Sequence, residues 1–562
     1  MNQPEQHQPA LRPHKSAGGI RFTFDGAPGL RSVAVAGTFN SWVGDDRPLR
    51  QIAPGRWQTT LPVATGRHLY KYVVDGRHWI LDPANPWVSE DGQNNSSFTV
   101  DGDGEVFIRS GHANAQHPGP LYLRHKALPS PAWLADGVVY QLSVRAFGAT
   151  FAGVQARLDH LAALGVGVIW MMPIHPVGID GRLGTLGDPY AVRDFGAIDP
   201  ALGDAAALRA LVDAIHARGM RLVLDWTLNR ASVDNILVAQ HPDWFTRRAG
   251  GAPFYAVPNR AYFAGLDFSR PDLRAHLLGA MRQWVAEFDI DGFRFDDSDI
   301  TPLDFLVEIR ESLRQIRPDI GLISQAYDEF HHLAACDLTY EGGTRDLILA
   351  LAGGRAAPAD FIRQWQDAAY SFPRDALRMR WLEEKEQGRA WRHYGPALHL
   401  AAAAILLTVD GVPHLMMGQE FNEPLWRDWR SLFEPFSLDW SAFDAPTLKH
   451  YQCLIGLRNR HPALRQGKLE FAAEQPDGAL AYWRGSGAAR ILVVVNLSAR
   501  AARLPACAHG LQCLYTSDRG HQAGERVDPA RGLAAHVCLL AQAAQAKQQL
   551  GAHVMRLQND VK

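Results

Sequence analysis

The fold is decided by residues 220–230, which read MRLVLDWTLNR. An apolar run that is almost unbroken indicates a strand buried on both faces, as in a parallel sheet covered by helices. The helical pattern ALRALVDAIHARG precedes it at residues 207–219, and polar residues follow directly after it. A helix, a buried strand and a polar end together predict one unit of an α/β fold.

The same pattern recurs on both sides of this stretch. A second helical pattern, LRAHLLGAMRQWVAEF, occupies residues 273–288. Eight strand candidates can be counted, at residues 138–144, 166–173, 220–226, 292–296, 321–327, 336–340, 376–384 and 412–420. Eight such strands with intervening helices predict a (β/α)8 TIM barrel over residues 132–461.

The flanking regions read as β-rich. Residues 19–100 carry short alternating runs between turn clusters, which predicts a β-sandwich, and alternation returns at residues 462–541 as an antiparallel C-terminal β-sandwich. Residues 101–131 are expected to be a linker, residues 1–18 a disordered tail and residues 542–562 a helical tail. The fold class is therefore multidomain α/β, in keeping with a length of 562 residues.

Composition excludes several classes of function. Lys plus Arg number 57 against 59 Asp plus Glu, and no basic run is long enough to bind a phosphate backbone, so nucleic acid is not an expected partner. No apolar stretch would serve as a signal peptide or a membrane span. Five cysteines without metal-ligand spacing favour reduced thiols and a cytoplasmic protein: Cys336, Cys453, Cys507, Cys513 and Cys538.

Charged and amide side chains gather where predicted strands end, which is where such barrels carry their chemistry. They are Asp225, Asn229, Arg230, Arg294, Asp296, Gln325, Glu384, Lys385 and Glu386. An Arg and an Asp two residues apart are equally compatible with a buried ion pair that only holds barrel loops together. Several charged groups close together are costly unless their electrostatics are organised, which favours a site.

Four ordered motifs make this region specific. They are YAVRDFGAIDPALG (190–203), RLVLDWTLN (221–229), DIDGFRFD (289–296) and GVPHLMMGQE (411–420). In this order they resemble the α-amylase superfamily, glycoside hydrolase family 13. The resemblance implies a retaining glycosidase or transglycosidase, in which one carboxylate attacks the anomeric carbon and a second group protonates the leaving oxygen.

Residue roles follow from this resemblance by position. It implies that Asp296 is the nucleophile and Arg294 its ionic partner, and that Tyr190 stacks under the sugar at the cleavage point. Asp225 and Asn229 match the first motif, where they support the arginine and the sugar site. No metal and no cofactor is expected.

Other positions depart from the family pattern. Arg230 stands where a histidine is expected, Gln325 stands where the general-acid glutamate is expected, and Asn-His-Asp is replaced by Glu384-Lys385-Glu386. A carboxamide has no acidic proton to give, and general acid–base catalysis is worth roughly 10²- to 10⁴-fold. These departures predict weak or absent hydrolysis.

Two further interpretations stay open. Glu329, and Glu383 or Glu384, are candidates for a substitute acid, against the simpler interpretation that each is a solvated carboxylate. The protein would then be an active retaining α-glucosidase or transglycosidase. Alternatively, Asp296 attacks an activated donor such as a glucosyl phosphate, whose leaving group needs no proton.

The N-terminal region has a resemblance of its own. It carries VAGTFNSW (35–42), YKYVVDG (70–76), DPANP (82–86) and GQNNSSF (92–98). These runs resemble the family 48 carbohydrate-binding module, in the version found in the β-subunit of AMP-activated protein kinase. The resemblance implies that Trp42 and Trp79 stack on pyranose rings while Lys71 and Asn95 bind hydroxyls, so the expected partner is an α-glucan. The alternative is that both tryptophans are core residues.

Overall fold

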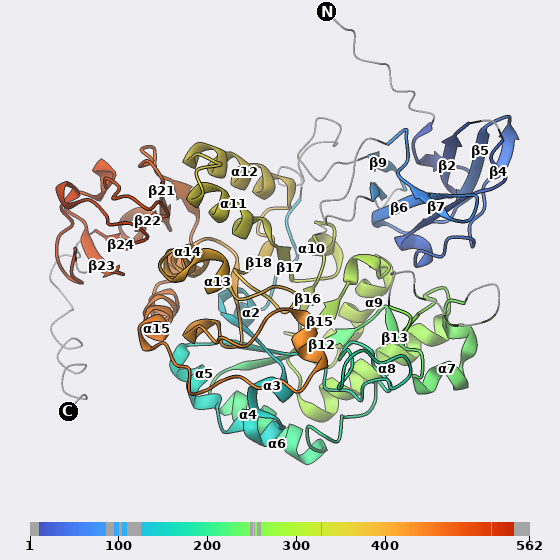
Figure 1. Cartoon of the computed structure of the whole chain (residues 1–562), viewed down its shortest axis with the longest axis horizontal. Helices are drawn as coiled ribbons and strands as arrows, with labels where there is room; N and C mark the ends of the chain where they lie inside the picture. Colours follow the sequence, from blue (N-terminus) through green and yellow to red (C-terminus); the bar gives the residue numbers. More distant parts are fainter. Residues whose placement is uncertain are drawn as a thin grey trace, which may run out of the picture. The chain divides into compact units, whose positions relative to one another are not determined.

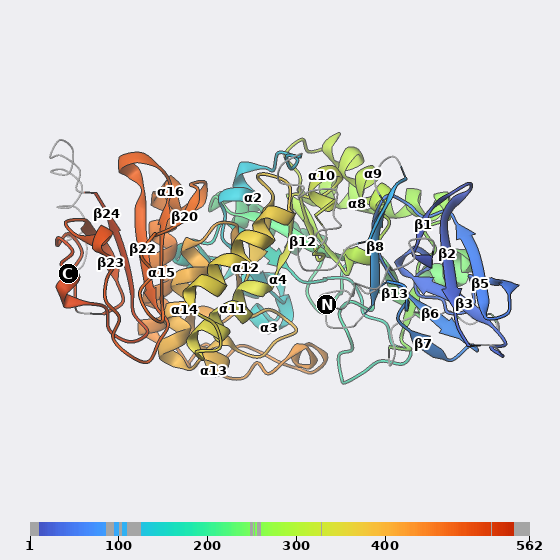
Figure 2. The same ribbon diagram turned by 90° about the horizontal axis from the view of Figure 1, so that it is seen from above.

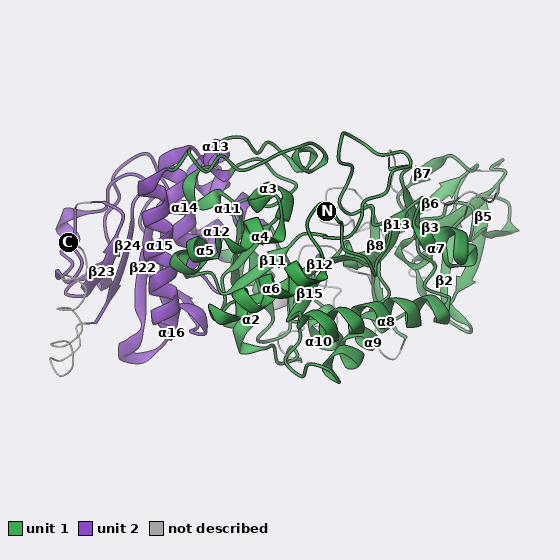
Figure 3. Cartoon of the chain, turned by 90° about the horizontal axis from the view of Figure 1, so that it is seen from below, with its two compact units in different colours: residues 1–342, 363–389, 411–443 green, residues 343–362, 390–410, 444–562 purple. Residues whose placement is uncertain are grey.

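The computed structural model describes residues 11–27, 29–85, 95–100, 104–108, 125–247, 251, 253, 255, 260–327, 329–518 and 520–543. Most of the predicted linker, and the predicted helical tail from residue 544 onward, lie outside these ranges. Figure 3 colours the chain by its two compact units. The first unit comprises residues 1–342, 363–389 and 411–443, and the second comprises residues 343–362, 390–410 and 444–562.

All eight predicted barrel strands are present in the first unit, and they close into one parallel barrel. In order around the barrel they are β10 (Val139–Leu142), β11 (Val168–Met171), β12 (Arg221–Thr227), β15 (Gly292–Asp296), β16 (Gly321–Ser324), β17 (Leu338–Glu341), β18 (Leu377–Arg380) and β19 (Val412–Met416). Every residue of β15 is buried, as expected for strands covered on both faces. The predicted (β/α)8 barrel is confirmed.

Helices of the first unit lie outside these strands (Figure 1). They include α5 (Leu158–Leu164), α6 (Ala205–Ala217), α8 (Pro271–Phe288) and α9 (Leu303–Arg314). Asp204 caps the N-terminus of α6, because its side chain accepts a hydrogen bond from the Ala207 N–H. The helix buries Leu208, Leu211, Val212 and Ile215 on one side. An acidic N-cap and an apolar stripe of this spacing are what place such a helix against a sheet.

The N-terminal region of the first unit is a β-sandwich. One sheet has the order β1 (His14–Ser16), β2 (Gly19–Asp25), β5 (Arg56–Leu61) and β4 (Arg50–Ala53). The other has the order β3 (Val33–Gly37), β6 (Gly66–Val74), β8 (Ser96–Val100) and β9 (Val106–Ile108), with β7 (His78–Ile80) paired to β6. Phe22, Tyr70 and Phe98 meet edge-to-face in the core between them, with ring centroids 5.5–5.6 Å apart.

The sandwich extends beyond the predicted residues 19–100 at both ends. β1 pairs antiparallel with β2, which Figure 2 shows side by side, so residues 14–16 are not part of a disordered tail. The two-residue turn Ala17–Gly18 makes this possible, because Gly18 adopts a left-handed φ of 90° that other residues rarely adopt. β9 likewise pairs with β8, so residues 106–108 belong to the sandwich and not to the linker.

The second unit consists of helices and one antiparallel β-sheet. Its helices include α11 (Gly343–Ala352), α13 (Ala390–Tyr394), α14 (Pro396–Thr408), α15 (Ala445–Arg460) and α16 (Pro462–Arg465). Its antiparallel sheet has the order β20 (Leu469–Phe471), β21 (Ala479–Arg484), β22 (Ile491–Asn496), β24 (Cys538–Gln542) and β23 (Gln512–Thr516). No helix in the described part of the chain is long and apolar enough to cross a membrane.

Candidate active site

The register of the barrel brings the first two motifs together at one rim. β12 and β15 pair so that Asp225 lies opposite Arg294 and Thr227 lies opposite Asp296. Nη1 of Arg294 donates to Oδ1 of Asp225 at 2.9 Å and to Oδ1 of Asp296 at 2.5 Å. All three side chains are almost completely buried. The arginine therefore bridges two carboxylates, and this arrangement neutralises charges that would be costly to bury alone.

Asp225 is held from two further directions. Its Oδ2 accepts a hydrogen bond from the Tyr190 hydroxyl at 2.7 Å and from the Trp170 Nε1 at 3.0 Å. The structure thus places Tyr190 beside Asp225. Sequence reasoning missed Trp170, which lies in β11 within a continuous apolar run and looks like a core residue there.

Gln325 follows β16 and faces the same arginine. Its Oε1 accepts hydrogen bonds from Nη2 of Arg294 and, at 3.1 Å, from the Asp297 N–H. Arg294 also donates to the hydroxyl of Tyr340 at 2.8 Å. Tyr340 lies in β17, and sequence reasoning missed it. Because the Gln325 oxygen is occupied as an acceptor, the amide nitrogen is the part of the side chain left to act, and it carries no acidic proton.

Arg230 occupies the space beside the predicted nucleophile. Its Nη2 donates to Oδ2 of Asp296, and its Nη1 donates to Oδ2 of Asp297 at 2.8 Å and to Oδ1 of Asn229 at 2.8 Å. Asn229 in turn donates to the backbone oxygens of Asp296 and Asp297, and so holds the turn in which Asp297 is left-handed, with φ of 45°. Asp297 is the second carboxylate of this cluster and was not among the predicted site residues.

Lys385 completes the ring of cations. Its Nζ lies 3.5 Å from Oδ1 of Asp296 and 2.9 Å from Oε1 of Glu386, and it stands over the Tyr190 ring at 4.9 Å. The Asp296 carboxylate therefore forms ion pairs with three cations, Arg230, Arg294 and Lys385. The predicted site residues of the barrel thus converge at one end of it.

The charges around Asp296 set its protonation. Burial alone would raise the pKa of Asp296, but Lys385, Arg230 and Arg294 outweigh it and hold that pKa well below the usual range. The carboxylate is therefore ionised at any physiological pH. Attraction to three cations also weakens its tendency to donate electrons to a carbon atom.

Glu384 lies on the same loop in a different environment. It is buried, its Oε1 accepts a hydrogen bond from the Glu386 N–H at 2.9 Å, and its Oε2 has no hydrogen-bond partner among the described residues. Burial first, and the neighbouring Glu386 second, raise the pKa of Glu384 from 4.5 to about 7. The carboxyl group of Glu384 therefore keeps its proton to a higher pH than an exposed glutamate does.

This raised pKa predicts a pH-dependent stability that Glu384→Gln removes. The unfolded chain loses the proton near pH 4.5 and the folded chain only near pH 7, so folding stability falls as pH rises between these values. The variant cannot ionise here. We expect its free energy of unfolding, relative to the natural chain, to increase by on the order of 3 kcal/mol between pH 4 and pH 8. Urea unfolding across this range measures it, with the exposed Glu311→Gln as the matched control; parallel curves for Glu384→Gln and the natural chain would contradict the raised pKa.

The residues predicted for the carbohydrate module lie in the sandwich but outside its core. Trp79 on β7 is 41% exposed, and Trp42 is half-buried with its ring centroid 6.4 Å from that of Trp79. Neither belongs to the apolar cluster of the sandwich. Lys71 lies on β6, and Asn95, just before β8, is buried. The two indoles thus form a pair at the surface of the sandwich.

No group of three or more His, Cys, Asp or Glu side chains within the described ranges is arranged to hold a metal ion. The cations Arg230, Arg294 and Lys385 occupy the neighbourhood of the carboxylates instead.

Comparison with known families confirms both resemblances. Residues 101–249 match the α-amylase catalytic domain, and residues 20–103 match the glycogen recognition site of AMP-activated protein kinase. The first match ends before β15, so the position of Asp296 rests on the motif and on the strand register.

Individual relatives point the same way. A cyclomaltodextrinase from a Bacillus species is 27% identical over 425 residues, which cover 65% of this chain and 73% of the relative. The α-amylase MalA of Haloarcula japonica is 27% identical over 451 residues, or 75% of this chain and 64% of the relative. Among solved structures, a maltogenic α-amylase, AmyB, from Thermotoga neapolitana is 26% identical with a TM-score of 0.65, covering 74% of this chain and 100% of that one.

Proposed function

We propose that this chain binds α-glucans and hydrolyses them weakly or not at all, since residues 101–249 match the α-amylase catalytic domain and residues 20–103 match a glycogen recognition site. The observation that carries this proposal is the Asp296 carboxylate, which is ion-paired to Arg230, Arg294 and Lys385. Gln325 supports the proposal through a second step, the protonation of the leaving oxygen, because an amide cannot act as the general acid there.

The positive charges near Asp296 disfavour the transition state of a glycosidase reaction. A glycosidase passes through a transition state in which the sugar ring carries positive charge. Arg230 and Lys385 would lie beside that charge, where histidines would be neutral donors in an ordinary member. Like charges at short range in a poorly solvated site repel strongly. The same residues that neutralise Asp296 therefore raise the barrier to its reaction.

A second candidate function is favoured by Glu384. This carboxyl group is buried, has an oxygen without a hydrogen-bond partner, and has a pKa raised to about 7. These are the properties of a general acid that acts at neutral pH. If Glu384 replaces the missing acid, the protein is an active retaining α-glucosidase or transglycosidase.

An assay of the full chain on glycogen and on an α-glucosyl fluoride, side by side, tests these functions. The fluoride leaves without a proton, so it reports on Asp296 alone, whereas glycogen also needs an acid. We expect both substrates to turn over far below the ordinary range for enzymes, roughly 1–10³ per second. A fast reaction with the fluoride only would favour a protein that acts on an activated donor. Fast hydrolysis of glycogen that Glu384→Gln abolishes would favour an active enzyme with Glu384 as its general acid.

A further inference from the structure

The sandwich and the barrel line one cavity next to Asp296. It has a volume of about 350 Å³ and lies within the first unit. The sandwich contributes Ser41, Trp42, Leu69 and Asn95 to its walls. The barrel contributes, among others, Tyr190, Arg230, Asp296, Lys385, Glu386 and Trp429. Two of the residues predicted to bind sugar on the module therefore face the same space as the predicted nucleophile.

A well-defined loop presents Trp42 to this cavity. The loop follows β3 as the short 3-10 helix η2 (Thr38–Asn40), where the Gly37 N–H donates to Oδ1 of Asn40 at 2.8 Å. The Trp42 N–H then donates to the Gly37 oxygen at 2.9 Å. Ser41 and Trp42 both adopt left-handed φ angles, 51° and 61°. Such angles cost about 1–3 kcal/mol each in non-glycine residues and are found preferentially at ligand sites.

The barrel supplies a second indole. Trp429 begins the 3-10 helix η6 (Trp429–Phe433), is half-buried, and has the Arg260 guanidinium 5.1 Å from its ring centroid. The walls of the same cavity also include the Lys385 ammonium ion and the Glu386 carboxylate, which pair with each other at 2.9 Å. Flat apolar faces combined with charged and amide groups are the complement of a pyranose ring, whose faces are apolar and whose rim carries hydroxyls.

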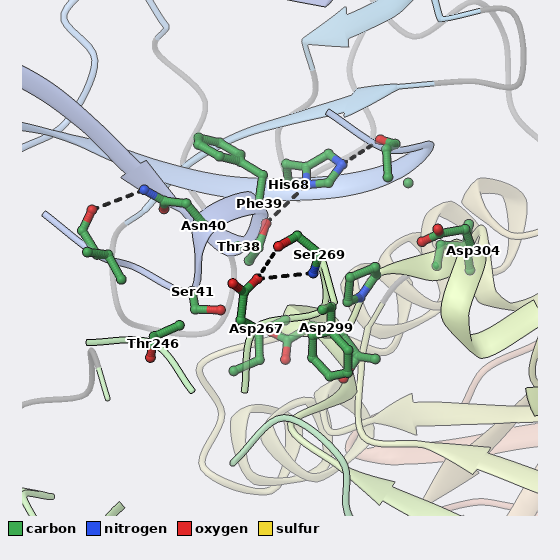
Figure 4. A pocket seen from close by; sticks show the side chains of 18 of the residues that line it. Thr38, Phe39, Asn40, Ser41, His68, Thr246, Asp267, Ser269, Asp299 and Asp304 are labelled. Carbon is green, nitrogen blue, oxygen red and sulfur yellow. Dashed lines mark hydrogen bonds between the residues drawn. The ribbon is translucent and has the colours of Figure 1, made fainter. Parts of the chain in front are cut away.

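A second cavity adjoins this one. A neighbouring cavity of about 380 Å³ shares Ser41, Asp299 and Ile300 with it. Figure 4 shows this second cavity, with Thr38, Ser41 and His68 of the sandwich on one side and Asp267 and Ser269 of the barrel on the other. Its walls are rich in hydroxyl and carboxylate groups. Both cavities therefore lie where the sandwich meets the barrel, and both present groups that can bind the hydroxyls of a sugar.

We propose that Trp42 and Trp429 are two walls of one α-glucan site, so that a single oligosaccharide chain is held by the sandwich and the barrel at once. This inference rests on the proposed function and deepens it. A shared site differs from a separate glycogen-binding surface on the sandwich, because residues of the sandwich then form part of the binding site of the barrel. The ligand class is a short linear α-glucan.

Calorimetric titration of the full chain with maltoheptaose, together with glycogen pull-down, tests the proposal. We expect one oligosaccharide site per chain. Trp42→Ala and Trp429→Ala should each weaken maltoheptaose binding by about tenfold, the scale of one lost aromatic stack. Both should also reduce glycogen pull-down. Ile52→Ala, which truncates an exposed apolar side chain on β4 of the same sandwich, should change neither measurement.

Three outcomes would count against the proposal. Two sites per chain, one lost with each tryptophan, would mean separate platforms. Glycogen pull-down that survives Trp429→Ala would mean the same, and this test does not depend on whether Trp42→Ala folds. Binding of no α-glucan by the natural chain would instead refute the proposed function itself, and the shared site with it.

Discussion

Restoring the family residues at five positions should raise glycogen hydrolysis by at least about 10²-fold, the lower end of what general acid–base catalysis supplies. The variant carries Arg230→His, Gln325→Glu, Glu384→Asn, Lys385→His and Glu386→Asp. It returns an acid to the fifth strand and removes two cations from the neighbourhood of Asp296. The initial rate of reducing-end release from glycogen measures the effect.

Gln325→Glu alone should recover less than a tenth of that gain. A glutamate there would still accept from Arg294 and from the Asp297 N–H, as the amide oxygen does, and Asp296 would remain ion-paired to Arg230 and Lys385. Adding Asp296→Asn to the five-position variant is the control, since it should return the rate to the background. A single substitution that recovers the whole gain would show that the cations do not limit the reaction.

Asp296→Asn in the natural chain should destabilise the first unit by about 3–5 kcal/mol, because it breaks buried ion pairs to three cations at once. Each cation then keeps a single carboxylate partner, which is Asp297, Asp225 or Glu386. Arg230 and Lys385 are nearly inaccessible to water, and both pair with this carboxylate. The midpoint of urea unfolding measures the change. Asp159→Asn is the matched control: Asp159 pairs with Arg218 at 2.8 Å but is largely exposed, and exposed pairs are worth at most about 1 kcal/mol.

Whether Asp296→Asn lowers or raises stability distinguishes two roles for Asp296. A nucleophile kept for catalysis is commonly held at some cost to stability, and its removal is then neutral or stabilising. A carboxylate that serves as the counter-charge for buried cations behaves in the opposite way. A neutral or stabilising Asp296→Asn would therefore remove the main support for weak hydrolysis.

The barrel could be predicted from the sequence because its strands are buried on both faces and read as apolar runs that few other elements produce. The ends of the sandwich could not. β1 and β9 have three residues each, which is too short for an alternating pattern to be recognised. The pairing of β1 depends on the turn at Gly18, which the sequence shows only as a Gly-Gly pair.

The candidate site was likewise predicted only in part. Asp225, Arg294 and Asp296, which were selected as strand-end residues, lie together because the parallel register of β12 and β15 leaves little freedom. The sequence did not predict that Arg230 and Lys385 both turn towards Asp296, because long side chains take their direction from the packing around them. Nor did it predict that Trp42 faces the barrel, which depends on how two modules pack.

The hairpin formed by β1 and β2 has a consequence for self-association. The seven residues of β2 would offer a long row of unpaired backbone groups if β1 were missing, and such an edge is a template for another molecule to add a strand. β1 covers Gly19–Arg21, the first three of these residues, and its own outer edge is three residues long and carries Lys15, which pairs with Glu105. Residues 14–16 therefore shorten the exposed edge of β2, and a fragment of the sandwich that starts at Gly19 would expose that edge over its full length.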